Sequence, residues 1–120
     1  MTKDPTVLFE HILESINLIE EYAADISEDV FLSDVGLQDK IIRRLSVIGE
    51  AMSHIPKEIQ EQHPEVRWRD IIGMRNFLIH EYFGISVAEV WGTVKKDVPL
   101  LREQILVIWE REKKRKPDSL

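Results

Sequence analysis

The apolar pattern of the last long segment places the strongest constraint on the fold. Apolar residues there follow spacings that alternate between four and three, at Val87, Trp91, Val94, Val98, Leu101, Ile105 and Ile108. This period lines them up on one stripe of an α-helix, as expected where helices pack nearly parallel in a bundle. Pro99 lies inside the stripe and is expected to bend the helix or to free the carbonyl of Lys95.

Four further helical segments precede this one, and no segment reads convincingly as a strand. Two of them carry long apolar stripes, at Leu8, Ile12, Ile16, Ile19, Ala23 and Ile26, and at Leu37, Ile41, Leu45, Ile48, Met52 and Ile55. Asp4 and Pro5 suit the start of the first helix, and a break is expected at 33–36. A short helix is predicted at 57–62, between two prolines.

The fourth helix is predicted from Trp68 to Tyr82, with Gly84 as its stop. Ser86 and Glu89 form a candidate capping box, Ser-x-x-Glu, that opens the last helix. Together the segments predict an all-α fold, an antiparallel bundle of four or five helices in one domain over residues 1–120. The basic stretch at about 111–120 is expected to be a frayed helix end rather than a dedicated binding tail.

A second apolar face is predicted beside the main stripes, and it leads us to expect a homodimer. Its members are Ile42, Val47, Ile72, Phe77 and Phe83. Periodicity alone does not establish the pairing.

Composition narrows the classes of function. The 120 residues contain no cysteine, which excludes disulfides, thiolate metal sites and cysteine nucleophiles. The net charge of −6 argues against a broad, sequence-independent nucleic-acid surface, although a small phosphate site stays compatible with it. The N-terminus has no apolar signal core and no apolar run approaches a membrane span, so a soluble cytoplasmic protein without a membrane partner is expected.

The candidate site is the cluster Arg75-Asn76-x3-His80-x-Tyr82 in the fourth helix. Asn76 and His80 are four residues apart and share a helix face. Arg75 and His80 are five apart, or about 140° around an ideal helix. Arg75 therefore reaches His80 only through its long side chain, through helix distortion, or across a dimer axis. Gly73 permits the close approach of a neighbouring backbone or of a phosphate.

Two interpretations of this cluster stay open on spacing alone. In the first, His80 exchanges protons near neutral pH, Arg75 binds a phosphate, and Asn76 orients the imidazole or the substrate. Together they would let an RNA 2′-hydroxyl attack its adjacent phosphodiester without a metal. In the second, the same residues form a buried polar network that ties the bundle together, and spacing by itself favours this network. The four histidines are dispersed along the chain, so no metal site is predicted.

Two segments resemble a known family. Residues 73–84, Gly-Met-Arg-Asn-Phe-Leu-Ile-His-Glu-Tyr-Phe-Gly, resemble the signature Arg-x4-His-x-Tyr of the HepT-like branch of the HEPN superfamily, which usually has Asn after the Arg. Residues 43–51, Arg-Arg-Leu-Ser-Val-Ile-Gly-Glu-Ala, resemble that family's Arg-x-Leu-x-x-Ile-Gly-Glu-Ala segment. Trp68 and the pair Val90-Trp91 also fit. The signature alone is a weak pattern, but both segments in order are specific.

The resemblance implies a helical homodimer whose catalytic cleft lies near the two-fold axis. It also implies a metal-independent endoribonuclease without a cofactor, the toxin of a type VII toxin–antitoxin pair whose partner is an MntA-like minimal nucleotidyltransferase. In that family's pattern Arg75 and His80 are the catalytic pair, Asn76 supports them, and Tyr82 is the AMPylation site. Glu50 and Arg43 are expected behind them, with Glu50 buried as an ion-pair partner.

A competing function comes from another class. The chain could be a non-catalytic nucleotide- or protein-binding subunit of a nucleotidyltransferase complex, and the acidic charge balance favours this modestly. That subunit would bind its partner without turning over RNA. A purely structural bundle is a third reading, in which removing Arg75 or His80 would unfold the protein.

Overall fold

The computed structural model describes residues 4–80 and 85–115 of the chain, and the described part is helical without strands. In chain order the elements are α1 (Pro5–Ala23), α2 (Glu28–Ser33), α3 (Val35–Ser53), α4 (Lys57–Gln62), α5 (Trp68–His80), α6 (Val87–Gly92), the π-helical segment η2 (Thr93–Asp97) and α7 (Val98–Arg115). The all-α prediction is confirmed. The bounds predicted for α4 agree with those observed, as do the predicted starts of α1 and α5.

Helix starts follow the capping residues that the sequence offers. Asp4 accepts a hydrogen bond from the backbone N–H of Thr6 at 2.9 Å, ahead of Pro5 in the first turn of α1. Asp34 caps α3 by accepting from Leu37 N–H, and Ser86 caps α6 by accepting from Glu89 N–H. Each cap satisfies one of the backbone donors that a helix leaves free at its N-terminus.

Helix α2 is absent from the sequence prediction. It has only six residues, and its N-cap Ser27 accepts a hydrogen bond from Val30 N–H. Phe31 is its one buried residue, and the ring lies 5.1 Å from that of Trp91 in α6. Tertiary packing of a single side chain, rather than an apolar stripe, fixes this helix in place, because a helix this short is not stable alone.

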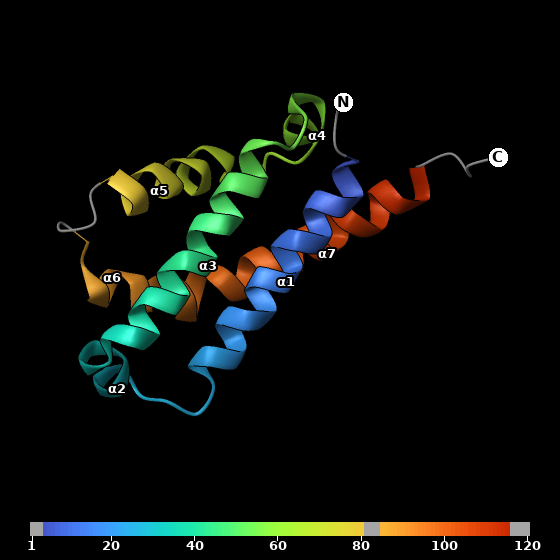
Figure 1. The fold of residues 1–120 in the computed structure, drawn as a ribbon. Coiled ribbons are helices and arrows are strands. Elements are labelled where there is room, and N and C mark those ends of the chain that lie inside the picture. Colours follow the sequence, from blue (N-terminus) through green and yellow to red (C-terminus); the bar gives the residue numbers. More distant parts are fainter. Residues whose placement is uncertain (1–3, 81–84, 116–120) are drawn as a thin grey trace.

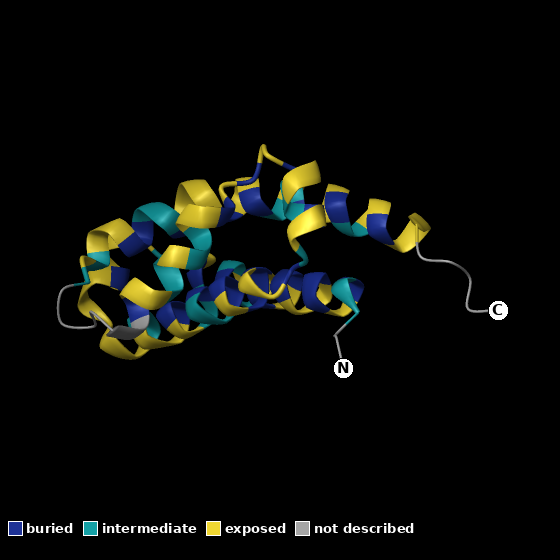
Figure 2. Ribbon diagram, turned by 90° about the horizontal axis from the view of Figure 1, so that it is seen from above, coloured by how far each residue is buried: buried dark blue, intermediate teal, exposed yellow. Residues whose placement is uncertain are grey.

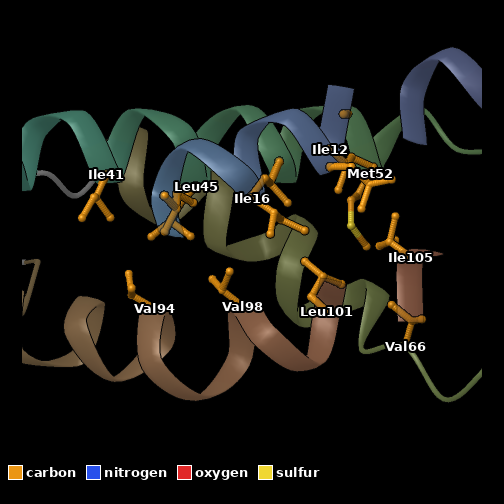
Figure 3. Packing of buried hydrophobic residues seen from close by; sticks show 14 of the residues in the cluster. Ile12, Ile16, Ile41, Leu45, Met52, Val66, Val94, Val98, Leu101 and Ile105 are labelled. Atoms are coloured by element: carbon orange, nitrogen blue, oxygen red, sulfur yellow. The ribbon is translucent and has the colours of Figure 1, made fainter. Parts of the chain in front are cut away.

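The long helices α1, α3 and α7 enclose the core. Figure 1 shows α1 lying beside α3 and α7, and α5 turning back across α3 after the short α4. Ile12 and Ile16 of α1, Ile41 and Leu45 of α3, and Ile105 of α7 meet in this core, each at most 2% exposed (Figure 3). The stripes predicted from spacing are therefore the faces that the bundle buries.

The predicted disturbance near Pro99 takes the form of the π-helical segment η2. The backbone N–H of Val98 bonds to the carbonyl of Thr93, five residues earlier. Pro99 has no N–H with which to hold the regular ladder, and the preceding turn widens. Val94, within η2, and Val98, directly after it, are both still buried in the core.

The predicted second apolar face is only partly available to a partner. Ile42 is buried within the protomer, and Val47 and Ile72 are half-buried, whereas Phe77 is exposed. Phe83 lies outside the described residues. Exposed and buried residues alternate around the helices, as a bundle requires (Figure 2). Ile42 is not available to an interface because it is buried in the core of its own protomer.

The C-terminal stretch is helical as far as residue 115. Arg115 is the last residue of α7 and donates hydrogen bonds to Gln62 and Glu112, while the Lys113 ammonium lies 3.7 Å from the centre of the Trp109 ring. Residues 116–120 lie outside the described part. None of the described helices is both long and apolar enough to cross a membrane.

Candidate active site

The site begins where α5 crosses α3 at a glycine. A Cβ on Gly49 would lie 2.7 Å from the Cβ of Arg75 and 3.1 Å from the carbonyl oxygen of Ile71. Glycine at this position therefore lets the two helix backbones approach closely. The crossing places Arg75 of α5 directly against α3, next to Glu50.

Two groups hold the Arg75 guanidinium. Its Nη1 donates to Oε1 of Glu50 across the helix crossing, in an ion pair. Its Nε donates to Oδ1 of Asn76 at 3.2 Å, and Nη2 donates to the same oxygen. The Arg75 side chain is 30% exposed, so the fixed guanidinium still borders solvent. A planar cation held in this way suits a phosphate, which accepts from its remaining donors.

Glu50 is paired as expected, but it is not buried. Its side chain is 48% exposed, because α3 presents it at the edge of the crossing rather than beneath it. Its second oxygen, Oε2, lies 2.9 Å from Nε2 of His54, one turn later in α3. Hydrogen bonds from His54 and then from Arg75 lower the pKa of Glu50 below its ordinary 4.5, against a smaller desolvation effect.

The structure brings only some of the predicted site residues together. It brings Arg75, Asn76 and Glu50 into direct contact. Arg43 lies exposed on α3, two turns before Glu50, and is not part of that hydrogen-bonded group. His80 is the last residue of α5, but its side chain is outside the described part, and Tyr82 is outside it altogether. The relation of the Arg75 and His80 side chains therefore stays a prediction.

A family comparison gives this cluster its context. The family model described as "Ribonuclease HepT-like" matches residues 12–108, which include α3, α5 and both segments quoted above. The chain belongs to the ribonuclease HepT-like family. The resemblance seen in the sequence is thereby confirmed at the level of the family.

Three HepT-like relatives show how far the likeness extends. A Methanocaldococcus jannaschii protein named "Gamma-glutamylcyclotransferase and putative RNase" is 46% identical over 97% of this chain, but the chain spans only 52% of that protein. A "Putative RNase" of Caldanaerobacter subterraneus subsp. tengcongensis is 40% identical over 92% of this chain and 99% of its own length. A "Probable ribonuclease HepT" of Thermococcus cleftensis is 46% identical over 78% and 84%. No solved structure matches the chain.

The sequence analysis did not single out His54, which contacts Glu50 of the polar cluster. Taken alone among dispersed histidines it gave no signal, and its side chain is 61% exposed. The signal that was available is the spacing Glu50-x3-His54, which places the two side chains one above the other on a helix. Within the described residues no three His, Asp or Glu side chains are grouped as metal ligands.

One cleft of the described structure is separate from the cluster. It has a volume of about 260 Å³ and lies between α5 and the helices η2 and α7. Met74, Asp70 and Leu101 are among its lining residues, whereas Arg75, Asn76 and Glu50 are not. Arg75, Asn76 and Glu50 are therefore not part of this cleft.

Proposed function

We propose that this chain is a metal-independent endoribonuclease and that its catalytic pair is Arg75 and His80. The observation that carries the proposal is the Arg75 guanidinium, held by Glu50 and Asn76 at a solvent-facing edge, within the segment that matches the ribonuclease HepT-like family. A structural network would not need to keep this cation at the surface. The names of the relatives add support, since all three contain RNase or ribonuclease.

The reaction we propose is an internal transesterification of RNA. The His80 imidazole accepts the proton of a 2′-hydroxyl, and the 2′-oxygen attacks the adjacent phosphorus as the bond to the 5′-oxygen breaks. The products are a 2′,3′-cyclic phosphate and a 5′-hydroxyl, whose oxygen takes up a proton. Arg75 stabilises the charge that develops on the non-bridging oxygens. Both tasks fall to side chains, so the step uses no cofactor.

Glu50 and Asn76 act through Arg75. Their carboxylate and amide oxygens accept from three nitrogens of one guanidinium and so restrict its orientation. Restricting a catalytic group before the substrate arrives reduces the entropy lost in reaching the transition state. Arg43 is assigned to the same side of α3 as Glu50, in a supporting position.

A homodimer is part of the proposal. Arg75 and His80 are about 140° apart around α5, so one helix does not direct both side chains at one phosphate without distortion. Two copies related by a two-fold axis would allow Arg75 of one protomer to work with His80 of the other.

We also propose that the chain is the toxin of a toxin–antitoxin pair and that an MntA-like minimal nucleotidyltransferase AMPylates Tyr82. Tyr82 is two residues from His80 in the sequence. An added AMP group would place a phosphate charge beside the site and would repel and obstruct an RNA phosphate.

Expression in cells tests this proposal. Wild-type protein should arrest growth, His80→Ala should not, and co-expression of the nucleotidyltransferase should relieve the arrest and add one AMP to Tyr82, as read by peptide mass spectrometry. The net charge of −6 favours a rival, a non-catalytic binding subunit of the nucleotidyltransferase. That rival predicts a stable complex with the partner but equal effects of wild-type and His80→Ala protein on growth.

A further inference from the structure

The transesterification proposed above moves two protons, and so far only one of them has a protein group assigned to it. His80 accepts the proton of the 2′-hydroxyl. The 5′-oxygen must gain a proton as its bond to phosphorus breaks, because an alkoxide is a poor leaving group. Arg75 cannot supply this proton, since a guanidinium stays charged in proteins. His54 touches the described cluster through Glu50, and histidine exchanges protons near neutral pH.

His54 and Arg75 share one carboxylate. Nε2 of His54 lies 2.9 Å from Oε2 of Glu50, and Nη1 of Arg75 donates to Oε1 of the same group. His54 reaches Glu50 because it follows four residues later in α3, whereas Arg75 reaches it across the crossing with α5. A single carboxylate group therefore separates the imidazole from the guanidinium.

The contact with Glu50 determines which nitrogen of His54 can release a proton. The pKa of Glu50 is lowered below its ordinary 4.5, so at neutral pH its carboxylate is ionised and only accepts hydrogen bonds. Nε2 of His54 must therefore be the donor, and the neutral imidazole keeps its hydrogen there. The protonated imidazole carries its second hydrogen on Nδ1. That hydrogen is the one that the ring loses when it acts as an acid.

Both His54 and Arg75 keep groups available for a substrate. The His54 side chain is 61% exposed, and its Nδ1 has no hydrogen-bond partner among the described residues. The three hydrogen bonds from Arg75 to Glu50 and Asn76 use three of the five N–H donors of a guanidinium. A phosphate that accepts from the other donors of Arg75 can present an ester oxygen to the neighbouring imidazole.

We propose that His54 is the general acid of the reaction and that its Nδ1–H protonates the departing 5′-oxygen. This inference rests on the proposed function, because it assigns a second catalytic residue to that same site. The bond from the 2′-oxygen to phosphorus forms as the bond from phosphorus to the 5′-oxygen breaks. The 2′-hydroxyl proton passes to His80 and the Nδ1 proton of His54 passes to the 5′-oxygen. His54 ends neutral, with Nε2–H still donated to Glu50, and exchange with solvent restores both histidines.

The assignment agrees with a site shared by two protomers. The attacking and leaving oxygens of a phosphoryl transfer lie roughly in line, on opposite sides of phosphorus. The base and the acid that serve these oxygens must therefore approach from opposite sides. In the proposed homodimer His54 and Arg75 come from one protomer and His80 comes from the other.

A structural role is the alternative for His54. The residue is the C-cap of α3, where a cation interacts favourably with the helix dipole, and its pair with Glu50 is exposed. Exposed pairs of this kind contribute little to stability. The structural role therefore predicts that His54→Ala slightly lowers stability and leaves RNA cleavage unchanged. General acid catalysis predicts a large loss of cleavage by a folded protein.

A change of leaving group tests the assignment. Two RNAs would be compared that differ only at the linkage cleaved by the wild-type protein, where the 5′-oxygen of one is replaced by sulfur. A thiol ionises near pH 8.5, as in cysteine, whereas water, which resembles an alcohol here, ionises only near about 15.7, so the thiolate leaves without an acid. His54→Ala should slow cleavage of the oxygen-linked RNA by about 10²–10⁴-fold and leave the sulfur-linked RNA nearly unaffected. His80→Ala should slow both, and the exposed-histidine control His11→Ala neither.

His54→Gln separates acid catalysis from positioning. The glutamine amide can still donate to Glu50 but has no proton to release near neutral pH, so this variant should be as slow as His54→Ala on the oxygen-linked RNA. A restored rate for His54→Gln would overturn the inference, as would an unchanged rate for His54→Ala or equal losses on the two RNAs.

The proposed function and this inference fail in different ways. Cleavage that requires His80 but not His54 would leave the proposed function standing and remove only the inference. Cleavage that requires His54 but not His80 would do the opposite. An absence of cleavage by the wild-type protein would overturn both.

Discussion

At the scale of single residues, Glu50 determines how the site is held. One of its oxygens accepts from Arg75 and the other contacts His54, so one carboxylate links α5 to a second turn of α3. Both contacts favour the ionised carboxylate, and the pKa of Glu50 is accordingly lowered. The carboxylate is therefore expected to stay ionised, and paired with Arg75, to a lower pH than an unpaired glutamate would.

Replacing Glu50 should have a pH-dependent effect on stability. The folded pKa lies below the ordinary 4.5, so the stabilisation is fully present above about that pH and is lost as the pH falls through the folded value. We expect Glu50→Gln to lower the free energy of unfolding by under about 1 kcal/mol at pH 7, because the pair is half-exposed. Urea denaturation of both proteins from pH 7 to pH 2 measures this. A difference that stays constant through the acidic range would contradict it.

The same residue should affect catalysis more than folding. Without the carboxylate the Arg75 guanidinium keeps only Asn76 as a partner, and it samples more orientations. We expect Glu50→Gln to reduce kcat for RNA cleavage by about 10- to 100-fold with a smaller change in KM, as for the loss of a group that orients a catalytic one. Multiple-turnover cleavage over a range of RNA concentrations gives kcat and KM, and single-turnover cleavage with enzyme in excess gives the rate of the chemical step. Glu58→Gln, on α4, is the matched control and should leave both constants unchanged.

At the scale of elements, two glycines give opposite expectations for the same substitution. Gly49→Ala should destabilise the fold by about 1–3 kcal/mol, because its methyl group would force α3 and α5 apart. Gly73→Ala should stabilise it by about 0.5–1 kcal/mol, since the new methyl group meets only solvent. Thermal unfolding of the two variants decides the matter, and the same sign for both would disprove the packing account.

Helix α2 offers a test of how one buried ring holds a short element. Phe31→Ala should cost about 3–5 kcal/mol, because Phe31 is fully buried against Trp91. Its neighbour Leu32 is 42% exposed, and Leu32→Ala should change stability by no more than about 0.5 kcal/mol. Equal losses for the two variants in urea denaturation would show that α2 is held in some other way.

The sequence predicts those elements whose information is local. Capping by Asp4 and Ser86 and the regular apolar stripes depend on neighbours a few residues away, and the structure confirms them. Helix α2 escaped prediction because its stability comes from Trp91, some sixty residues later. The form of the change before Pro99 was also beyond reach, since spacing indicates a disturbance but not a π-helical turn.

In the candidate site, too, the features that depend on local sequence were predicted and those that depend on distant residues were not. The signature residues were recognised from their pattern, and Glu50 was expected to form an ion pair, although its partner Arg75 was not predicted. The exposure of Glu50 was predicted wrongly, because it depends on where α5 crosses α3 at Gly49. His54 was missed because its role is visible only through Glu50.

At the scale of the whole molecule, the polar cluster belongs in part to a helix, α5, at one end of the bundle. The described chain is elongated, with extents of 52 × 29 × 25 Å, and α5 crosses one end of the bundle while α7 extends toward the other (Figure 1). An overall charge of −6 is compatible with a small phosphate site at Arg75. Long-range repulsion of RNA by the remaining acidic surface is screened beyond about 8–10 Å at physiological salt.

The central claim is that the Arg75–His80 signature is a metal-independent nuclease site, and one measurement tests it most directly. Purified wild-type, His80→Ala and His11→Ala proteins would be incubated with single-stranded RNA in EDTA, with circular dichroism to verify that each is folded. His11 is an exposed histidine of α1, away from the cluster, and serves as the control. We predict cleavage to a 2′,3′-cyclic phosphate by wild-type and His11→Ala proteins and none by folded His80→Ala protein. Equal cleavage by His80→Ala, or no cleavage by any of the three, would contradict the claim.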